Sequence, residues 1–190
     1  MSIVDFNLEA VNQINSVLQE LDLGDSKDRL VVIGGAVMAA LGLKSLTETD
    51  IDIAVTDPLL ARLRHDDRWK GFPRTTGNYH TLLSKKQGVV KRIARYPDIH
   101  TIRGDVSALR MPIDDVYPVT SEELINESLV VASDAGEFRY APLARVLDMK
   151  ISLVRSDIYE GEVDKHVQDI STIVHYQREL RSAKSIIKKI

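Results

Sequence analysis

The chain contains no cysteine among its 190 residues, which excludes disulfide bonds and cysteine-ligated zinc sites. Its five histidines form no His-x-His or His-Glu-x-x-His pattern, so a histidine-based zinc site is not expected either. The chain also lacks a nucleophile elbow, an internal repeat and any apolar run of about eighteen residues, the length of a transmembrane helix. Its first residues carry no basic leader, so we expect a cytoplasmic protein without a membrane partner.

Acidic and basic residues are unevenly distributed, although the net charge is only −3. Residues 57–110 contain twelve lysines or arginines and five acidic residues, a local balance of +7 that leaves −10 for the remainder. A basic middle in an acidic chain favours a polyanionic partner, and the alternative is a solvated basic surface. The C-terminal stretch is basic too, a pattern typical of a solvated helix end favoured by the helix dipole: Arg178, Arg181, Lys184, Lys188 and Lys189.

Residues 30–55 carry the most informative pattern in the chain. The apolar run 30–33 predicts a buried strand, Gly34 and Gly35 predict a turn, and residues 36–43 predict a short helix. Residues 49–55 predict a second strand, which carries Asp50 and Asp52. Because the side chains of a strand alternate, Asp50 and Asp52 share one face, while the isoleucine between them points to the other.

Two carboxylates on one face of a strand repel each other, which costs stability unless a cation lies between them. Mg²⁺ takes oxygen ligands and accompanies phosphates, so Asp50 and Asp52 are candidate metal ligands. A helix that starts at Gly34 and Gly35 offers free N–H groups that suit a phosphate. Taken singly, a glycine pair is typical of a tight turn, and alternating acids are typical of a solvated strand face. Their direct succession favours a site for phosphoryl or nucleotidyl transfer, because aspartate is a poor strand former.

The remaining patterns predict an α/β (α+β) fold, with a mixed sheet, flanking helices and a helical C-terminal lobe. Helices are predicted over residues 7–23, 58–70, 120–126 and 142–155, and from 163 to the C-terminus. Strands are predicted within 79–103, over 111–119, and as a pair over 129–132 and 137–140. We expect a core over residues 1–141 and the helical lobe over residues 142–190.

The succession of Gly34-Gly35, a helix and Asp50-Ile51-Asp52 resembles the signature of the nucleotidyltransferase superfamily that includes DNA polymerase β. Within that superfamily, three stretches resemble the AbiEii-type (MenT-like) nucleotidyltransferase toxins of bacterial toxin–antitoxin systems. They are the motif TDIDI and the segments APLARVLDMKISLVRSD and KHVQDIS. The resemblance covers about residues 30–175. It implies an enzyme that moves a nucleoside monophosphate from an NTP to an acceptor hydroxyl and releases pyrophosphate.

The resemblance also implies roles for residues outside this first motif. The superfamily needs a third carboxylate on a neighbouring strand, for which Asp114 is our choice and Asp115 the alternative, since adjacent strand residues face opposite sides. A second interpretation is that both acids cap a turn. Lys150 falls on the apolar stripe of the helix 142–155, where a lysine either snorkels to the edge or serves a site. The resemblance favours a role for Lys150 near the nucleotide phosphates, with Asp169 as its ionic partner.

The expected enzyme depends on Mg²⁺ or Mn²⁺. Asp50 and Asp52 hold two metal ions about 3.5–4 Å apart in this hypothesis, and Asp114 completes the metal site on the acceptor side. The backbone of Gly34 and Gly35 cradles the triphosphate of the NTP.

The acceptor expected from the toxin resemblance is tRNA or another RNA, and a cognate antitoxin is the further partner that it implies. The basic middle would hold the RNA backbone electrostatically, through residues such as Lys85, Lys86, Lys91 and Arg92. One rival is a nucleotidyltransferase that modifies a small-molecule antibiotic, whose cationic acceptor calls for an acidic cleft. The other rival is a non-catalytic binding member of the fold.

Overall fold

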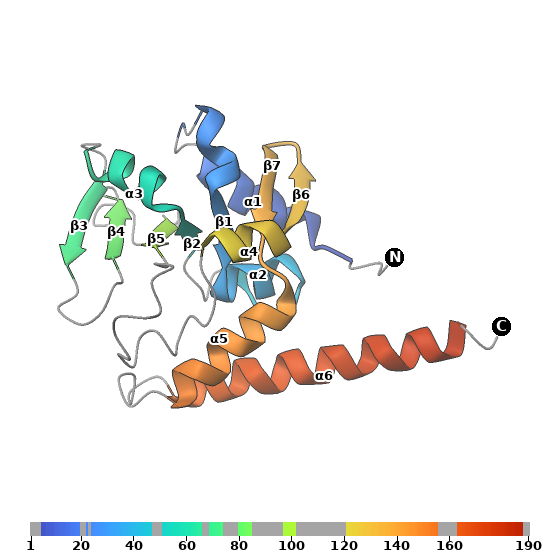
Figure 1. Cartoon of the computed structure of the whole chain (residues 1–190). Coiled ribbons are helices and arrows are strands. Elements are labelled where there is room, and N and C mark those ends of the chain that lie inside the picture. The colour runs from blue at the N-terminus through green and yellow to red at the C-terminus, as the bar shows by residue number, and fades with distance from the viewer. Residues whose placement is uncertain are drawn as a thin grey trace.

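The computed structural model describes the chain over residues 5–19, 22, 24–46, 51–65, 69–73, 80–84, 97–101, 121–155 and 163–187. Within these residues, seven strands form one mixed sheet in the order β3-β4-β5-β2-β1-β7-β6. Helices pack against the sheet, and the last two helices, α5 and α6, cross below it in the view of Figure 1. The fold class predicted from the sequence, a mixed α/β sheet with flanking helices, is therefore confirmed.

The centre of the sheet is the pair β1 (Leu30–Ile33) and β2 (Ile51–Val55), which run antiparallel to each other. All four residues of β1 are buried, as expected for an apolar strand with neighbours on both sides. On the other side, β1 pairs in parallel with β7 (Gly136–Tyr140), which forms a hairpin with β6 (Leu129–Ser133). The predicted strand pair over residues 129–140 is thus confirmed.

The other half of the sheet follows β2. Strand β5 (Pro97–Thr101) pairs in parallel with β2, and β4 (His80–Ser84) lies antiparallel to both β5 and β3 (Trp69–Pro73). The predicted helix over 58–70 is wrong in its C-terminal part, because α3 (Asp57–Arg64) ends before the strand that begins at Trp69. Tryptophan and phenylalanine favour strands, and pairing with β4 decides the outcome there.

The N-terminal helix α1 (Leu8–Gln19) is shorter than the predicted helix over residues 7–23. Asp22 and Gly24 both have positive φ angles, 48° and 51°, a conformation that ends helices. The chain then makes the 3-10 helix η1 (Gly24–Arg29), which leads directly into β1.

A buried asparagine fixes α1 to the β6–β7 hairpin. The side-chain amide of Asn15 donates to the carbonyl oxygens of Gly136 at 2.9 Å and Val131 at 3.3 Å. Its oxygen accepts a 2.7 Å hydrogen bond from the hydroxyl of Tyr140, whose pKa is raised by burial. Since a buried amide is costly unless its hydrogen bonds are satisfied, this network sets the position of α1 on the sheet.

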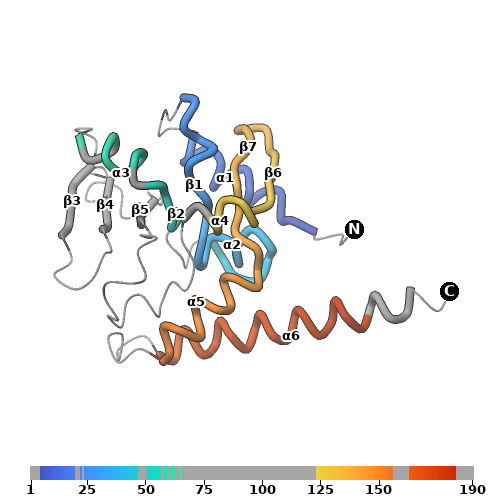
Figure 2. The backbone as a smooth tube through the Cα atoms, in the orientation of Figure 1, coloured from blue at the N-terminus to red at the C-terminus, as the bar shows by residue number. Residues whose placement is uncertain are grey.

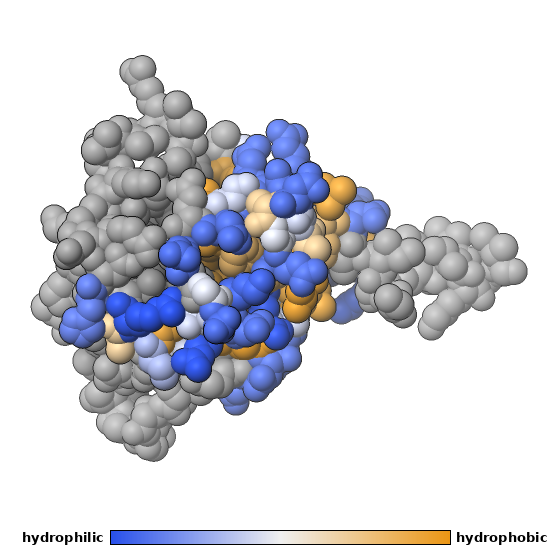
Figure 3. Space-filling model, turned by 90° about the horizontal axis from the view of Figure 1, so that it is seen from above, coloured by the Kyte–Doolittle hydropathy of each residue, from blue (hydrophilic) through white to orange (hydrophobic). Residues whose placement is uncertain are grey.

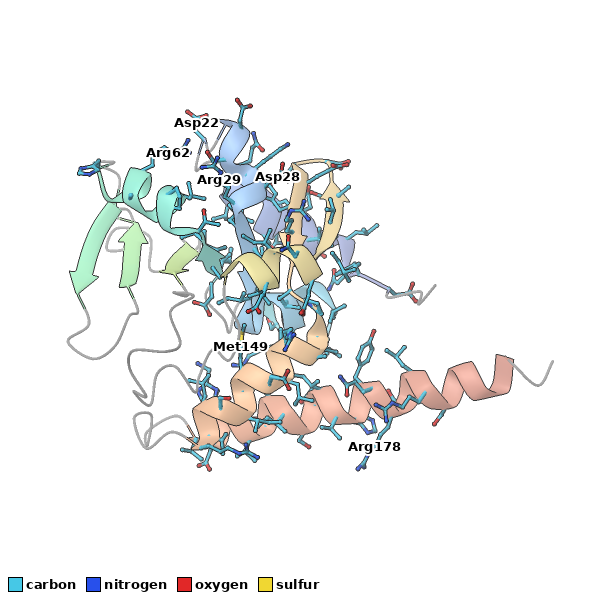
Figure 4. All side chains as sticks on the ribbon, in the orientation of Figure 1. Asp22, Asp28, Arg29, Arg62, Met149 and Arg178 are labelled. Carbon is cyan, nitrogen blue, oxygen red and sulfur yellow. The ribbon has the colours of Figure 1, made fainter. Side chains whose placement is uncertain are left out.

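The helices that complete the molecule are α2 (Gly34–Ala40), α4 (Ser121–Glu127), α5 (Leu143–Arg155) and α6 (Val163–Ile187). Helix α5 packs between α2 and α6, and Figure 4 shows Met149 on the side of α5 that faces α2. The guanidinium of Arg145 on α5 makes two hydrogen bonds to the carboxylate of Glu127 at the end of α4, at 2.6 and 2.7 Å. The two C-terminal helices predicted from the sequence are therefore present, whereas the boundary at residues 141 and 142 stays a prediction.

One contiguous core is formed by the side chains of α1, β1, α2, β2, β7 and α5. The described part of the face seen in Figure 3 is mostly hydrophilic, with smaller hydrophobic areas between. Among the described helices, none has the length and apolar character that would let it cross a membrane.

Candidate functional site

The turn between β1 and α2 brings the predicted glycine pair to the end of the central strand. Gly34 has a φ of +63°, in the left-handed region that glycine adopts without a steric penalty. It keeps part of its surface open, whereas Gly35 is buried in α2. If one of the two glycines meets a ligand through its backbone, the open position is therefore Gly34.

Asp52 lies directly against this turn. The antiparallel register pairs Asp52 with Ile33, the residue before Gly34. A Cβ atom added to Gly34 would stand 2.9 Å from the Oδ2 atom of Asp52, so a larger residue could not occupy this position without displacing the carboxylate. The absence of a side chain at Gly34 thus makes room for the Asp52 carboxylate beside the turn.

Asp52 is the one residue of β2 that is not buried. Ile51 and Ile53 are 1% and 0% exposed, whereas Asp52 between them is partly exposed. The Asp52 carboxylate is therefore partly exposed near the start of β2, a position that suits a metal ligand. Asp50, Asp114 and its alternative Asp115 lie outside the described residues, and their roles as ligands stay predictions.

The described residues contain no group of three or more histidine, cysteine or acidic side chains that could hold a metal ion. Only one of the three carboxylates predicted for the site, Asp52, belongs to that part of the chain. Its oxygen donors fit Mg²⁺, and the space over Gly34 that a Cβ would fill leaves the carboxylate accessible.

Lys150, which falls on the apolar stripe of α5, is buried. It is only 6% exposed, so the interpretation that it snorkels to the edge does not hold. Its Nζ atom lies 2.8 Å from Oδ2 of Asp169 on α6, which confirms the expected ion pair. Because an unpaired ammonium group would be costly in the interior, Asp169 is what allows Lys150 to be buried.

A second lysine shares the same carboxylate. Nζ of Lys44, in the connection after α2, donates to Oδ1 of Asp169 at 2.8 Å. Burial by itself raises the pKa of Asp169, but the hydrogen bonds and charges of Lys150 and Lys44 outweigh it, and the net pKa is lowered. Asp169 is therefore ionised at neutral pH, and two lysines against one carboxylate leave the cluster with one surplus positive charge.

Neither Lys44 nor His166 was singled out from the sequence. Nδ1 of His166 lies 3.4 Å from Nζ of Lys150. Since an ammonium group has only donors, this ring nitrogen is the acceptor in the contact. Lys44 carries no local sequence signal, because a lysine in a turn is normally exposed to solvent. In the structure its side chain is only 12% exposed.

A pocket of about 280 Å³ borders the Asp169 cluster, between the α2–β2 connection and α6. It is lined by Leu43, Lys44, Lys165, Gln168, Asp169 and Thr172. The residues predicted to hold RNA, namely Lys85, Lys86, Lys91 and Arg92, lie outside the described residues.

Comparisons with known proteins add one solved structure. The chain is similar to a structure described as an antigenic nucleotidyltransferase-like protein from Paracoccidioides brasiliensis, with a TM-score of 0.48 and 12% sequence identity. The similarity covers 95% of this chain and 88% of that one. No protein-family model and no curated protein match the chain.

Proposed function

We propose that the chain is a metal-dependent nucleotidyltransferase, which moves a nucleoside monophosphate from an NTP to an acceptor hydroxyl. The observation that carries the proposal is the contact between the Asp52 carboxylate and the Gly34 turn. This contact brings together the glycine turn and the strand aspartate, the two parts of the motif that resembles the superfamily signature. A strand aspartate and a backbone turn open to a phosphate are the two elements that nucleotidyl transfer needs at one place.

Asp52, together with Asp50 and Asp114, is proposed to hold Mg²⁺ or Mn²⁺. Such an ion supplies positive charge that neutralises phosphate oxygens and activates an acceptor hydroxyl. The open backbone of Gly34 lets the triphosphate approach closely, because no side chain stands in its way.

Lys150 is proposed to contact the nucleotide phosphates from the lobe side. An ammonium group has three donors, and the contacts with Asp169 and His166 engage two of them. In this proposal the third donor binds a phosphate oxygen while Asp169 holds the side chain in position. Lys44 shares Asp169 and joins this arrangement to the chain segment that connects α2 to β2.

The acceptor is proposed to be tRNA or another RNA, and the protein to act as the toxin of a toxin–antitoxin pair with a cognate antitoxin as its partner. Support comes from the resemblance of residues 30–175 and from the basic balance of residues 57–110. A small-molecule acceptor with positive charge is disfavoured by the same balance.

The experiment that tests the proposal compares wild type with Asp52→Asn in transfer of label from an α-labelled NTP to bulk tRNA. We expect the variant to lose transfer by about a hundredfold or more, because the carboxylate is removed while its size is kept. The matched control is Asp28→Asn, an exposed aspartate just before β1 and so at the opposite end of that strand. Transfer by Asp52→Asn near the wild-type rate would contradict the mechanism.

A further inference from the structure

The second half of α6 projects from the molecule without a partner among the described residues. Helix α6 has 25 residues, whereas α5, the element against which it packs, has 13. At about 1.5 Å per residue α6 is roughly 37 Å long. Among residues 163–182, whose burial the structure describes, the buried ones are His166, Asp169 and Ile173, in the first half of the helix. Figures 1 and 2 show the later part running past the end of α5 and away from the sheet.

Positive charge is concentrated in this projecting part. Residues 174–190 contain five lysines or arginines and one acidic residue, in a chain whose net charge is −3. Arg178 and Arg181 are exposed, and within the described residues neither guanidinium forms an ion pair. Figure 4 shows Arg178 pointing away from the body of the molecule.

The cations gather on one face of the helix. Because an α-helix turns by about 100° per residue, positions 178, 181 and 184 fall within about 120° of its circumference. The acidic residue of this stretch, Glu179, lies about 100° from Arg178 in the other direction, and its carboxylate is 3.2 Å from His175. The basic face therefore carries no carboxylate of its own helix.

The helix dipole explains only part of this charge. Cations near a helix C-terminus are favoured over the last turn, and the effect falls off beyond it. Arg178 lies more than two turns before Ile187, where α6 ends. The dipole therefore accounts for cations in the last turn of α6, but not for Arg178 and Arg181, which lie before it.

We propose that the basic face of α6, formed by Arg178, Arg181 and Lys184, binds the phosphate backbone of the acceptor RNA. This inference rests on the proposed function, which supplies RNA as the partner. It adds a second RNA-binding surface to the one proposed for residues 57–110. Exposed guanidinium groups such as those of Arg178 and Arg181 bind phosphate oxygens, and position 184 places a third cation on the same face of the helix. The described exposed residues of this part, Arg178, Glu179, Arg181 and Ser182, are all polar, which favours RNA over a lipid surface as the polyanion.

The test is the affinity for a fluorescein-labelled RNA hairpin, measured by anisotropy between about 50 and 200 mM KCl, without NTP or divalent metal. The variant is Arg178→Glu with Arg181→Glu. We expect about a tenfold or greater loss of affinity at the lowest salt, and a salt slope that is flatter by about two, since each lost phosphate contact removes nearly one unit.

The matched control is Lys27→Glu with Arg29→Glu in η1, which changes the net charge by the same amount at the far end of β1. We expect this control to stay within about threefold of wild type, because phosphate contacts are local. Equal losses of RNA affinity in both variants would show that affinity depends only on net charge, and would overturn the proposal. So would an unchanged affinity of the Arg178 and Arg181 variant, or binding to phosphatidylserine vesicles in place of RNA.

Failure of this proposal and failure of the proposed function are distinguishable. The binding assay needs no transfer, so Asp52→Asn should bind the hairpin as wild type does. If wild type transfers label to tRNA and the α6 variant binds RNA normally, only the basic face is disproved.

Discussion

Gly34 meets two separate demands at one residue. Its φ of +63° is strained for any other amino acid, and its missing side chain leaves room for Oδ2 of Asp52. Gly42 has a similar φ of +69°, yet nothing lies within 4 Å of the Cβ that it lacks. Gly42 therefore meets only the backbone requirement, whereas Gly34 meets both the backbone requirement and the requirement for space beside Asp52.

This difference gives a prediction for alanine at each position. Both Gly34→Ala and Gly42→Ala should lower the free energy of unfolding by about 1–2 kcal/mol, because alanine disfavours the left-handed conformation. Only Gly34→Ala should also lower nucleotidyl transfer, by about tenfold or more, because its Cβ displaces the Asp52 carboxylate. Urea unfolding and transfer assays on both variants check this, and equal transfer by the two would disprove the role of the contact.

Helix α6 depends on Asp169 for its place beside α5 and the α2–β2 connection. Replacement of Asp169 by alanine leaves the buried ammonium group of Lys150 and the partly buried one of Lys44 without this counter-charge. We expect a loss of about 3–5 kcal/mol in the free energy of unfolding, as for other broken buried pairs. Asp164→Asn, an exposed change in the first turn of the same helix, should cost less than about 1 kcal/mol. Similar losses for both variants would contradict this account of the cluster.

The pH dependence of this stabilisation has a defined sign. Because the folded-state pKa of Asp169 is lowered from its ordinary value of 3.8, the stabilisation is complete above that value. It is lost as the pH falls below 3.8 towards the folded-state pKa. The difference in unfolding free energy between wild type and Asp169→Asn should therefore shrink in this acid range and stay constant from about pH 5 to 6. A difference that grew on acidification would have the wrong sign.

The elements that could be predicted from the sequence are those whose signals are local. The strand pattern singled out Asp52, the one residue of β2 that is partly exposed, and the apolar stripe of α5 singled out Lys150, which is buried. The strand at Trp69 was mistaken for helix because its stability comes from pairing with β4, which no local pattern shows. Lys44 was missed for the same reason, since its burial depends on Asp169, 125 residues away.

At the scale of the whole molecule, the C-terminal helices are joined to the central sheet through α2 and the α2–β2 connection. The contact of α5 with α2 and the pairing of Lys44 with Asp169 connect them. Charge is distributed on the same scale, with basic residues in 57–110 and 174–190 and acidic residues in excess elsewhere. This distribution suits an enzyme that binds a long polyanion at more than one place while a small site performs the transfer.

The central claim is nucleotidyl transfer, and the most direct measurement asks which phosphate of the NTP reaches the acceptor. Wild-type protein is incubated with Mg²⁺, bulk tRNA and each of the four NTPs, labelled in turn at the α- or the γ-phosphate. We predict that label from the α-phosphate of at least one NTP becomes attached to the RNA, while γ-label is released as pyrophosphate. Attachment of γ-label would show phosphoryl transfer instead, and no attachment of α-label from any NTP would contradict the account.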